Sequence, residues 1–339
     1  MKAMVCKKYG LLDLTQIERP VPKGNEVLVE VRASSVTTHN LLLVSGRPFF
    51  VRLMALAPIR PKVKIPGSDV AGRVAAIGRD VRRFQAGDEV FGDLSPCGFG
   101  ALAEYVCVPE DFLARKPANL TFEEAAAVPQ AALVALQGLR DKGHIQKGQE
   151  VLIYGASGGL GTFAVQIAKC FGAEVTGVCS TRNLDMVRSL GAGYVVDYTK
   201  EDFTKRCQRY DLIFAIAYHP IFDFMRVLNP NGTYVSSGGP SLRRIFQDMV
   251  VGPWISKSGK KKVVGGWSLT PNKDLAFMTE LIEAGKVRPV IDRSYPLSEA
   301  AEAFRYFGEG HSRGKVVVTV GACGGPGAHT IEENASRGL

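Results

Sequence analysis

Residues 148–169 read GQEVLIYGASGGLGTFAVQIAK, and this stretch decides the fold. It contains an apolar strand at residues 151–153, then a glycine-rich turn, then a helix that we place at residues 162–171. Glycine allows a tight turn and a close approach of the backbone to a ligand. Because the first N–H groups of a helix are unpaired and its dipole is positive there, this order of elements suits a pyrophosphate. A turn without a ligand is the alternative, but the flanking strand and helix favour a dinucleotide site. The candidate phosphate-binding residues are Ala156, Ser157, Gly158, Gly159, Leu160 and Gly161.

A second expected strand, residues 174–179, ends in a turn that selects the cofactor. This turn contains Ser180, Thr181 and Arg182 and no carboxylate. An acid there would bind the ribose hydroxyls and repel a 2′-phosphate, whereas hydroxyls and a guanidinium suit that phosphate. We therefore predict NADP(H). The alternative is that Ser180 and Thr181 cap the next helix while Arg182 is solvated, and the two interpretations are compatible.

The pattern along the 339 residues predicts an α/β protein with more than one domain. Residues 1–122 are rich in alternating strands, which predicts a rolled antiparallel β domain. Thr121 and Glu124 form a capping box that opens an alanine-rich helix, and repeated strand–helix units follow. These units predict a doubly wound parallel sheet over residues 123–268. We expect residues 269–321 to return to the first domain and residues 322–339 to form a flexible tail.

The composition is that of an ordinary globular protein, with 46% hydrophobic and 22% charged residues. No apolar run is long enough to span a membrane, so we expect no membrane partner. The beginning of the sequence shows no secretory pattern, and the seven cysteines are scattered without a C-x-x-C pair. We therefore expect reduced thiols and a cytoplasmic protein. The net charge of +9 permits nucleic-acid binding, but the lysines of residues 257–262 lack interleaved aromatics, so we expect a solvated loop there.

These motifs together resemble the medium-chain dehydrogenase/reductase superfamily, and within it the zinc-independent quinone oxidoreductases that include zeta-crystallin-like proteins. The resemblance covers residues 1–320. Its most specific motif consists of Gly148, Gln149, Leu152, Ala156, Ser157, Gly158, Gly159, Gly161, Gln166 and Lys169. Further landmarks are residues 66–72 (PGSDVAG), 87–92 (GDEVFG), 103–105 (AEY) and 313–317 (RGKVV).

The resemblance implies a GroES-like catalytic domain and a Rossmann cofactor domain, and it suggests a homodimer. It implies that Tyr198 lies near the adenosine phosphate of the cofactor. It also implies that Gly238, Gly239, Gly314 and Lys315 lie near the nicotinamide half. A solvated strand end is the alternative for Lys315.

The residues at the superfamily's zinc positions do not favour a metal. Thr37 stands in the place of a cysteine ligand and Ser68 in the place of a histidine ligand. Hydroxyl groups are poor ligands for zinc, and after Gly92 only Cys97 and Cys107 are available for a structural zinc lobe. We therefore predict that no metal is bound, and we interpret His39 as a hydrogen-bonded loop residue.

Without a Lewis acid, the resemblance implies hydride transfer to a quinone or an α,β-unsaturated carbonyl, with the cofactor supplying the hydride. Thr37 and Asn40 are the predicted catalytic residues, as hydrogen-bond donors to the acceptor oxygen, and solvent supplies the final proton. The family usually carries Asn and Asp at these two places, and often Thr in place of Val134, so this chain departs from the pattern.

Two alternatives for the function remain open. The first is an NADP-dependent alcohol dehydrogenase, against which the missing zinc ligands argue. The second is a non-catalytic protein that binds NADPH or RNA, which the positive charge permits. The expected substrate is a small, hydrophobic, electrophilic molecule. Candidate pocket residues, each of which could equally be core, are Pro48, Phe49, Phe50, Leu53, Met54, Trp254 and Trp267.

Overall fold

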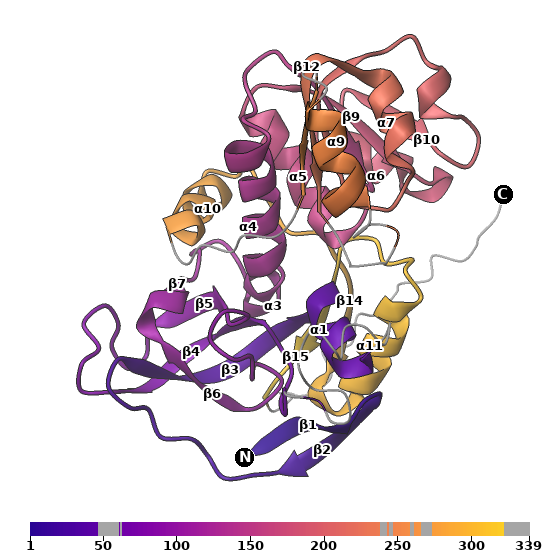
Figure 1. The fold of residues 1–339 in the computed structure, drawn as a ribbon. Helices are drawn as coiled ribbons and strands as arrows, with labels where there is room; N and C mark the ends of the chain where they lie inside the picture. Colours follow the sequence, from indigo (N-terminus) through magenta and orange to yellow (C-terminus); the bar gives the residue numbers. More distant parts are fainter. Residues whose placement is uncertain are drawn as a thin grey trace, which may run out of the picture.

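The structure is a computed structural model that describes residues 1–46, 61, 63–237, 243, 247–257, 261–265 and 273–321. Figure 1 shows two bodies, one above the other, each built around a sheet. The predicted tail and Gly238, Gly239, Trp267 and residues 48–54 lie outside the described residues.

The upper body contains a six-stranded sheet in the order β10-β9-β8-β11-β12-β13, and every neighbouring pair is parallel. Its strands are β8 (Glu150–Tyr154), β9 (Glu174–Cys179), β10 (Tyr194–Asp197), β11 (Tyr210–Ala215), β12 (Leu228–Ser236) and β13 (Lys262–Val264). The strand order reverses between β8 and β11. In such a sheet the carboxyl ends of these two strands border a crevice that binds ligands.

Helices cover both faces of this sheet (Figure 1). They are α4 (Pro129–Gln137), α5 (Gly159–Cys170), α6 (Leu184–Ser189), α7 (Ile221–Val227) and α9 (Gly252–Lys257). A further helix, α10 (Lys273–Glu283), packs against α4. Shorter helical turns are η2 (Gly138–Lys142), η3 (Thr181–Asn183), η4 (Phe203–Lys205) and η5 (Gln247–Val251). Val151 and Ile153 of β8 belong to the core that includes α4 and α5, whereas Leu152 belongs to the core under α7. The sheet is therefore buried on both sides, as parallel sheets are.

The lower body contains a mainly antiparallel sheet in the order β14-β15-β3-β4-β5-β7, and β6 also pairs with β3. Its strands are β3 (Glu26–Val36), β4 (Asp69–Ile77), β5 (Glu89–Asp93), β6 (Tyr105–Pro109), β7 (Leu113–Arg115), β14 (Ile291–Pro296) and β15 (Lys315–Thr319). A separate hairpin pairs β1 (Lys2–Lys8) with β2 (Leu11–Gln16). The accompanying helices are α1 (Thr38–Ser45), α3 (Phe122–Ala126), α11 (Ala300–Gly308), η1 (Glu110–Phe112) and η6 (Leu297–Glu299).

This arrangement confirms the predicted fold class, a rolled β body joined to a doubly wound parallel sheet. The late strand β15 pairs antiparallel with β3, so the end of the described chain does pair with its first part. The predicted domain limits at residues 122 and 268 stay predictions, because the fold fixes the pairing of strands and not those limits.

Two expected elements differ from the structure. The alanine-rich helix after Thr121 has its predicted capping box, but it ends at Ala126 and α4 begins anew at Pro129. Proline has no N–H for an earlier carbonyl, so it starts a helix more readily than it continues one. Helix α5 begins at Gly159 and not at residue 162, which brings the last glycines of the turn into its first turn.

No helix among the described residues has both the length and the apolar character needed to cross a bilayer.

Candidate active site

The turn after β8 holds α5 against its strand with no side chain between them. A Cβ on residue 161 would lie 2.1 Å from the carbonyl oxygen of Gly155, so only glycine fits there. Gly155 itself has a φ of 93°, which favours glycine. Gly158 is the N-cap of α5 and offers no side chain to the helix. The N–H groups of the first turn are therefore not capped by a side chain, as an anion-binding site requires.

A cavity of about 380 Å³ borders this turn. Five of the predicted site residues line it: Thr37, Gly158, Gly159, Leu160 and Lys315. The other described candidates do not: Asn40, Ala156, Ser157, Gly161, Ser180, Thr181, Arg182, Tyr198 and Gly314. Much of the remaining wall is apolar: Val36, Leu41, Ala131, Val134, Ile216 and Phe307. The wall of the cavity therefore combines the glycine-rich turn with apolar side chains.

Four polar wall residues were not among the predicted site residues: Thr38, Gln130, Ser237 and Ser312. Gln130 and Ser237 lie in stretches to which the family resemblance pointed, so the resemblance could have identified them as site residues. Ser312 follows the amphipathic helix α11, and no local pattern marks it. Trp254, a predicted pocket or core residue, is 70% exposed and lies outside the cavity wall, so both interpretations of it were wrong.

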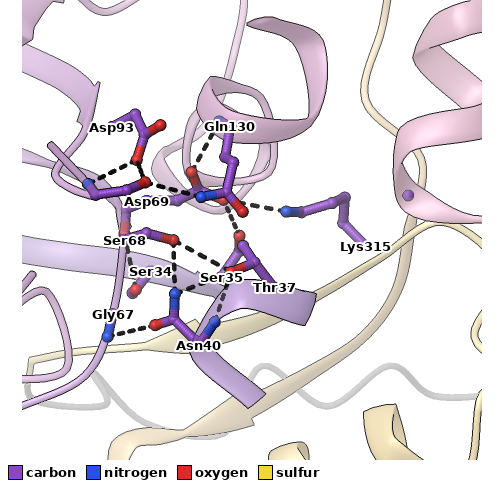
Figure 2. A network of polar contacts seen from close by, with 12 residues as sticks. Ser34, Ser35, Thr37, Asn40, Gly67, Ser68, Asp69, Asp93, Gln130 and Lys315 are labelled. Carbon is purple, nitrogen blue, oxygen red and sulfur yellow. Dashed lines mark hydrogen bonds and ion pairs between the residues drawn. The ribbon is translucent and has the colours of Figure 1, made fainter. Parts of the chain in front are cut away.

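Thr37 and Asn40 form one buried hydrogen-bonded unit (Figure 2). Thr37 is the N-cap of α1, and its Oγ1 accepts from the backbone N of Asn40 at 3.2 Å and from Nδ2 at 2.9 Å. Asn40 Nδ2 also donates to Ser68 Oγ at 2.9 Å, and Oδ1 accepts from the backbone N of Gly67 at 2.6 Å. Both amide hydrogens of Asn40 are thus used inside the protein, and Asn40 lies behind Thr37 with no donor left for a ligand.

The hydroxyl hydrogen of Thr37 is left to be donated. Its oxygen already accepts two hydrogen bonds, and a hydroxyl has one O–H besides its two lone pairs. The available acceptors are Ser68 Oγ, 3.4 Å away, or a group in the cavity that Thr37 lines. Thr37 is therefore the donor of the pair, and Asn40 orients it.

By the family resemblance, Thr37 and Ser68 of this unit stand at the superfamily's zinc positions. The hydroxyls of Thr37 and Ser68 bond to one amide, and alcohols are weak zinc ligands. Across the described residues, no three His, Cys, Asp or Glu side chains are grouped to hold a metal. The donor set there does not fit zinc, while the absence of a metal stays a prediction.

Lys315, at the start of β15, is buried with an exposure of 3%. Its Nζ lies 3.0 Å from Oδ2 of the buried Asp69 (Figure 2). Its aliphatic chain packs against the glycine turn, because a Cβ on residue 159 would lie 2.8 Å from Lys315 Cδ. The alternative of a solvated strand end is therefore wrong. Lys315 connects the two bodies, and Gly314 N bonds to Ser157 O at 3.0 Å beside it.

Asp93, the last residue of β5, lies directly opposite Asp69 in the register of β4 and β5. Burial first, and then the charge of Asp69, raises the pKa of Asp93 to about 7. Sequence reasoning missed both acids, because their pairing follows from the register of two strands and not from a local motif.

The residues predicted to bind the adenosine end of the cofactor lie in and beside the turn after β9. Asn183 Nδ2 donates to Ser157 Oγ at 3.1 Å and to Ser180 Oγ at 3.2 Å, so it ties this turn to the glycine turn. Arg182 is exposed, and its Nη2 donates to the carbonyl of His311 at 2.5 Å. The backbone N of Tyr198 bonds to Cys179 O at 3.1 Å, which places Tyr198 beside the end of β9.

The neighbouring strand supplies a carboxylate that the sequence did not reveal. Asp197, at the end of β10, accepts hydrogen bonds from the hydroxyls of Thr181 and Thr199. These bonds, that of Thr181 first, hold the pKa of Asp197 below its usual range. Because the hydroxyl of Thr181 already donates to Asp197, Ser180 and Arg182 are the groups of this turn that can still bind a phosphate.

The residues present fit a dinucleotide cofactor. A Cβ at Gly159 would clash with Lys315 and one at Gly161 with the backbone of the turn, so both positions need glycine, and α5 begins without a side-chain cap. Both lie at the carboxyl end of β8, next to the point where the strand order reverses.

Comparison with known proteins agrees with this geometry. Residues 23–118 match the alcohol dehydrogenase GroES-like domain, and residues 190–318 match a zinc-binding dehydrogenase family. A chloroplast envelope quinone oxidoreductase homolog from Arabidopsis thaliana is 34% identical, over 94% of this chain and 98% of the relative. An NADPH-dependent alkenal/one oxidoreductase of the same plant, described as chloroplastic, is also 34% identical, over 94% of this chain and 79% of the relative.

A solved quinone oxidoreductase from Coxiella burnetii superposes with a TM-score of 0.82 at 28% identity, over 95% of this chain and 99% of that one. A GroES-like body joined to a doubly wound sheet with a glycine-rich first turn defines the medium-chain dehydrogenases and reductases. The chain belongs to this superfamily, and the expected family is confirmed.

Proposed function

We propose that this protein is an NADPH-dependent reductase of quinones or α,β-unsaturated carbonyl compounds. The observation that carries the proposal is one cavity lined both by the glycine turn of α5 and by the Thr37 hydroxyl. The printed names of relatives, a quinone oxidoreductase homolog and an alkenal/one oxidoreductase, support the same chemistry. An apolar wall suits a hydrophobic acceptor.

The glycine turn would hold the pyrophosphate on the N–H groups of α5, with Ala156, Ser157 and Gly158 forming its floor. When bound, the nicotinamide supplies the hydride. Ser180, Arg182 and Tyr198 would hold the 2′-phosphate end, because Arg182 offers charged donors there. Gly314 and Lys315 would border the nicotinamide half, and Gly238 and Gly239 stay predictions in the same region.

Thr37 would act on the acceptor. Thr37 lines the cavity in which negative charge would develop on the acceptor oxygen, and a hydroxyl donor positioned there would stabilise that charge. Asn40 is a positioning residue, since both of its amide hydrogens are used on Thr37 and Ser68. Of the two predicted donors, only Thr37 therefore has a hydrogen available for the acceptor.

Alcohol oxidation receives less support. It needs a Lewis acid to ionise the alcohol, and the hydroxyls of Thr37 and Ser68 are poor metal ligands. A cofactor-binding protein without turnover would share the glycine turn, so only an activity measurement separates it from a reductase.

The test is the decay of NADPH absorbance with purified protein, a chelator, and either an orthoquinone or an alkenal, with NADH in parallel. Acceptor-dependent decay that is faster with NADPH supports the reductase. Binding of NADPH without consumption of any acceptor would overturn it in favour of a binding protein. Reduction of NADP by an alcohol that stops with the chelator would favour a zinc dehydrogenase.

We also propose that two copies associate through the free edge of the upper sheet. Within the described residues, β13 pairs with β12 alone, and exposed apolar side chains lie beside it on η5 and α9, namely Met249, Val250 and Trp254. An open edge next to apolar surface is a template for pairing with another chain. A cytoplasmic location stays a prediction, since the relatives named above are chloroplast proteins by their printed names.

A further inference from the structure

Three charged side chains are buried together beside the cavity: Asp69, Asp93 and Lys315, none of them more than 4% exposed. Asp69 and Asp93 are partners across the antiparallel strands β4 and β5, so their side chains lie on one face of the sheet. Residues paired in this way have Cβ atoms roughly 5 Å apart. Two carboxylates share one ammonium, which leaves one negative charge without compensation in the interior. Burying such a charge is costly, so the cluster favours one bound proton.

The hydrogen bonds decide which acid carries this proton. Asp69 accepts from Gln130 N at 2.9 Å, from Lys315 Nζ at 3.0 Å and from the hydroxyl of Ser35. Both carboxylate oxygens of Asp69 therefore already accept hydrogen bonds, and one of the three donors is charged.

Asp93 is held differently. Its Oδ1 accepts from the backbone and hydroxyl of Ser95, but its buried Oδ2 has no hydrogen-bond partner among the described residues. The charges that act on Asp93 are those of Asp69 and Lys315, and the nearby thiol of Cys97 has its pKa raised by burial and so stays neutral. Asp93 is therefore the acid that is protonated.

We propose that Asp69, Asp93 and Lys315 hold one transferable proton at the cavity wall, stored on Asp93 and delivered from Lys315 Nζ to the oxygen of the reduced acceptor. The delivery of the proton from Lys315 rests on the proposed reductase function, whereas the storage of the proton on Asp93 does not. Lys315 lines the cavity, and Asp69 lies between Lys315 and Asp93 as the ion-pair partner of one and the cross-strand neighbour of the other.

The proton balance is complete within the cluster. After reduction the acceptor oxygen carries a negative charge, and a neutral product needs one proton. An Nζ–H bond of Lys315 breaks and an O–H bond forms on the acceptor, which leaves a neutral amine. The carboxyl proton of Asp93 then passes by way of Asp69 to Nζ and restores the ammonium. The cluster changes from neutral to a charge of −1, and solvent returns one proton after the product leaves.

The storage of a proton on Asp93 is tested by infrared titration of protonated carboxyl groups in the protein without cofactor. We expect the wild type to show a buried-carboxyl band that disappears with a midpoint near pH 7, in line with the pKa of about 7. We expect D93N to lack this band and D111N, which changes an exposed carboxyl of the same body, to retain it. A wild-type spectrum without such a band at pH 6, or a band unchanged in D93N, would overturn the store.

The delivery is tested by the pH profile of turnover, with the NADPH dissociation constant measured beside it by fluorescence. In the wild type we expect kcat to fall with rising pH about tenfold per unit above the midpoint. In D93N we expect a lower kcat without this titration. K315R keeps the positive charge beside Asp69 but cannot release a proton, so we expect kcat at saturating NADPH to fall about 100-fold.

Each outcome decides something. Equal pH profiles for the wild type and D93N, or full kcat in K315R, would leave Lys315 a structural connection and overturn the delivery. If no acceptor is consumed by the wild type, the proposed reductase function and the delivery both fail, and the titration without cofactor still decides the store.

Discussion

One hydroxyl group provides the polar contact of the proposed site. T37V removes the hydroxyl of Thr37 and keeps the shape of the side chain. We expect kcat for an orthoquinone or an alkenal to fall about 100-fold, since loss of one donor to a developing oxyanion costs that much. The matched control T37S retains the hydroxyl and should keep most of kcat. Equal steady-state kinetics for T37V and the wild type would show that Thr37 does not contact the acceptor oxygen.

Gly161 is required by space alone. A Cβ there would lie 2.1 Å from Gly155 O, and the backbone atoms around it cannot move away independently. We expect G161A to lower the free energy of unfolding by about 2 kcal/mol or more, as overpacking of a tight contact does. G158A is the control, because the nearest atom to its Cβ would be 3.8 Å away. Urea unfolding of both variants checks this, and similar losses in the two would contradict the steric argument.

Asp93 makes the stability of the protein depend on pH. Its pKa of about 7 in the folded state is above that of an unfolded carboxyl, about 3.9. Stability contributed by the protonated form is complete below about pH 4 and is lost as pH rises toward 7, by at most about 4 kcal/mol. We expect D93N to escape this loss, so its melting temperature should exceed that of the wild type most clearly at pH 8. An advantage of D93N that grew toward acid pH would contradict the assignment.

Among the elements, the turn between β9 and η3 is the one that we propose to select NADPH over NADH. We expect R182A to raise the KM for NADPH about tenfold or more and to leave that for NADH nearly unchanged, because a charged hydrogen bond to the phosphate contributes about 1.5–3 kcal/mol. R188A is the control, an exposed arginine of α6 that pairs with Asp185. Equal losses with both cofactors would show that Arg182 acts on the loop at His311 and not on a 2′-phosphate.

Local patterns were sufficient to predict the strands β8 and β9 of the upper sheet, whereas the edge strand β13 was missed. Apolar runs and the glycine turn placed β8 within one residue of its bounds and β9 at its observed bounds. The capping box at Thr121 was also present. The predicted start of α5 was three residues too late because glycine is a poor helix former. The sequence does not show the close packing against Gly155 that allows the helix to begin at Gly159.

The acids of the site were beyond local reasoning. Asp69 and Asp93 become neighbours through strand register, and Lys315 meets Asp69 across 246 positions of sequence. Asp197 likewise reaches Thr181 from the adjacent parallel strand. Thr37, in contrast, was singled out through the family resemblance, and it does line the cavity, while its catalytic role stays a prediction.

At the scale of the whole molecule, the free edge of the upper sheet makes association testable. We expect light scattering after size exclusion to give twice the chain mass, and W254E to shift the population toward monomer, because it places a charge on an exposed apolar surface. Trp254 is 70% exposed in the single chain, so the substitution should not unfold the protein. D111N, on the other body, is the control. A wild-type monomer at micromolar concentration would contradict the proposal.

The pairing of β15 with β3 also sets an order of events during synthesis. A ribosome that has released β3, β4 and β5 has produced a sheet that still lacks its neighbour on one side, and that neighbour is encoded at residues 315–319. The upper sheet, whose strands all lie between, can fold first as a contiguous unit. Contacts this distant in sequence form slowly. The nascent strand β3 therefore keeps an open edge until residues 315–319 have emerged, and an open edge is a template for pairing with another chain.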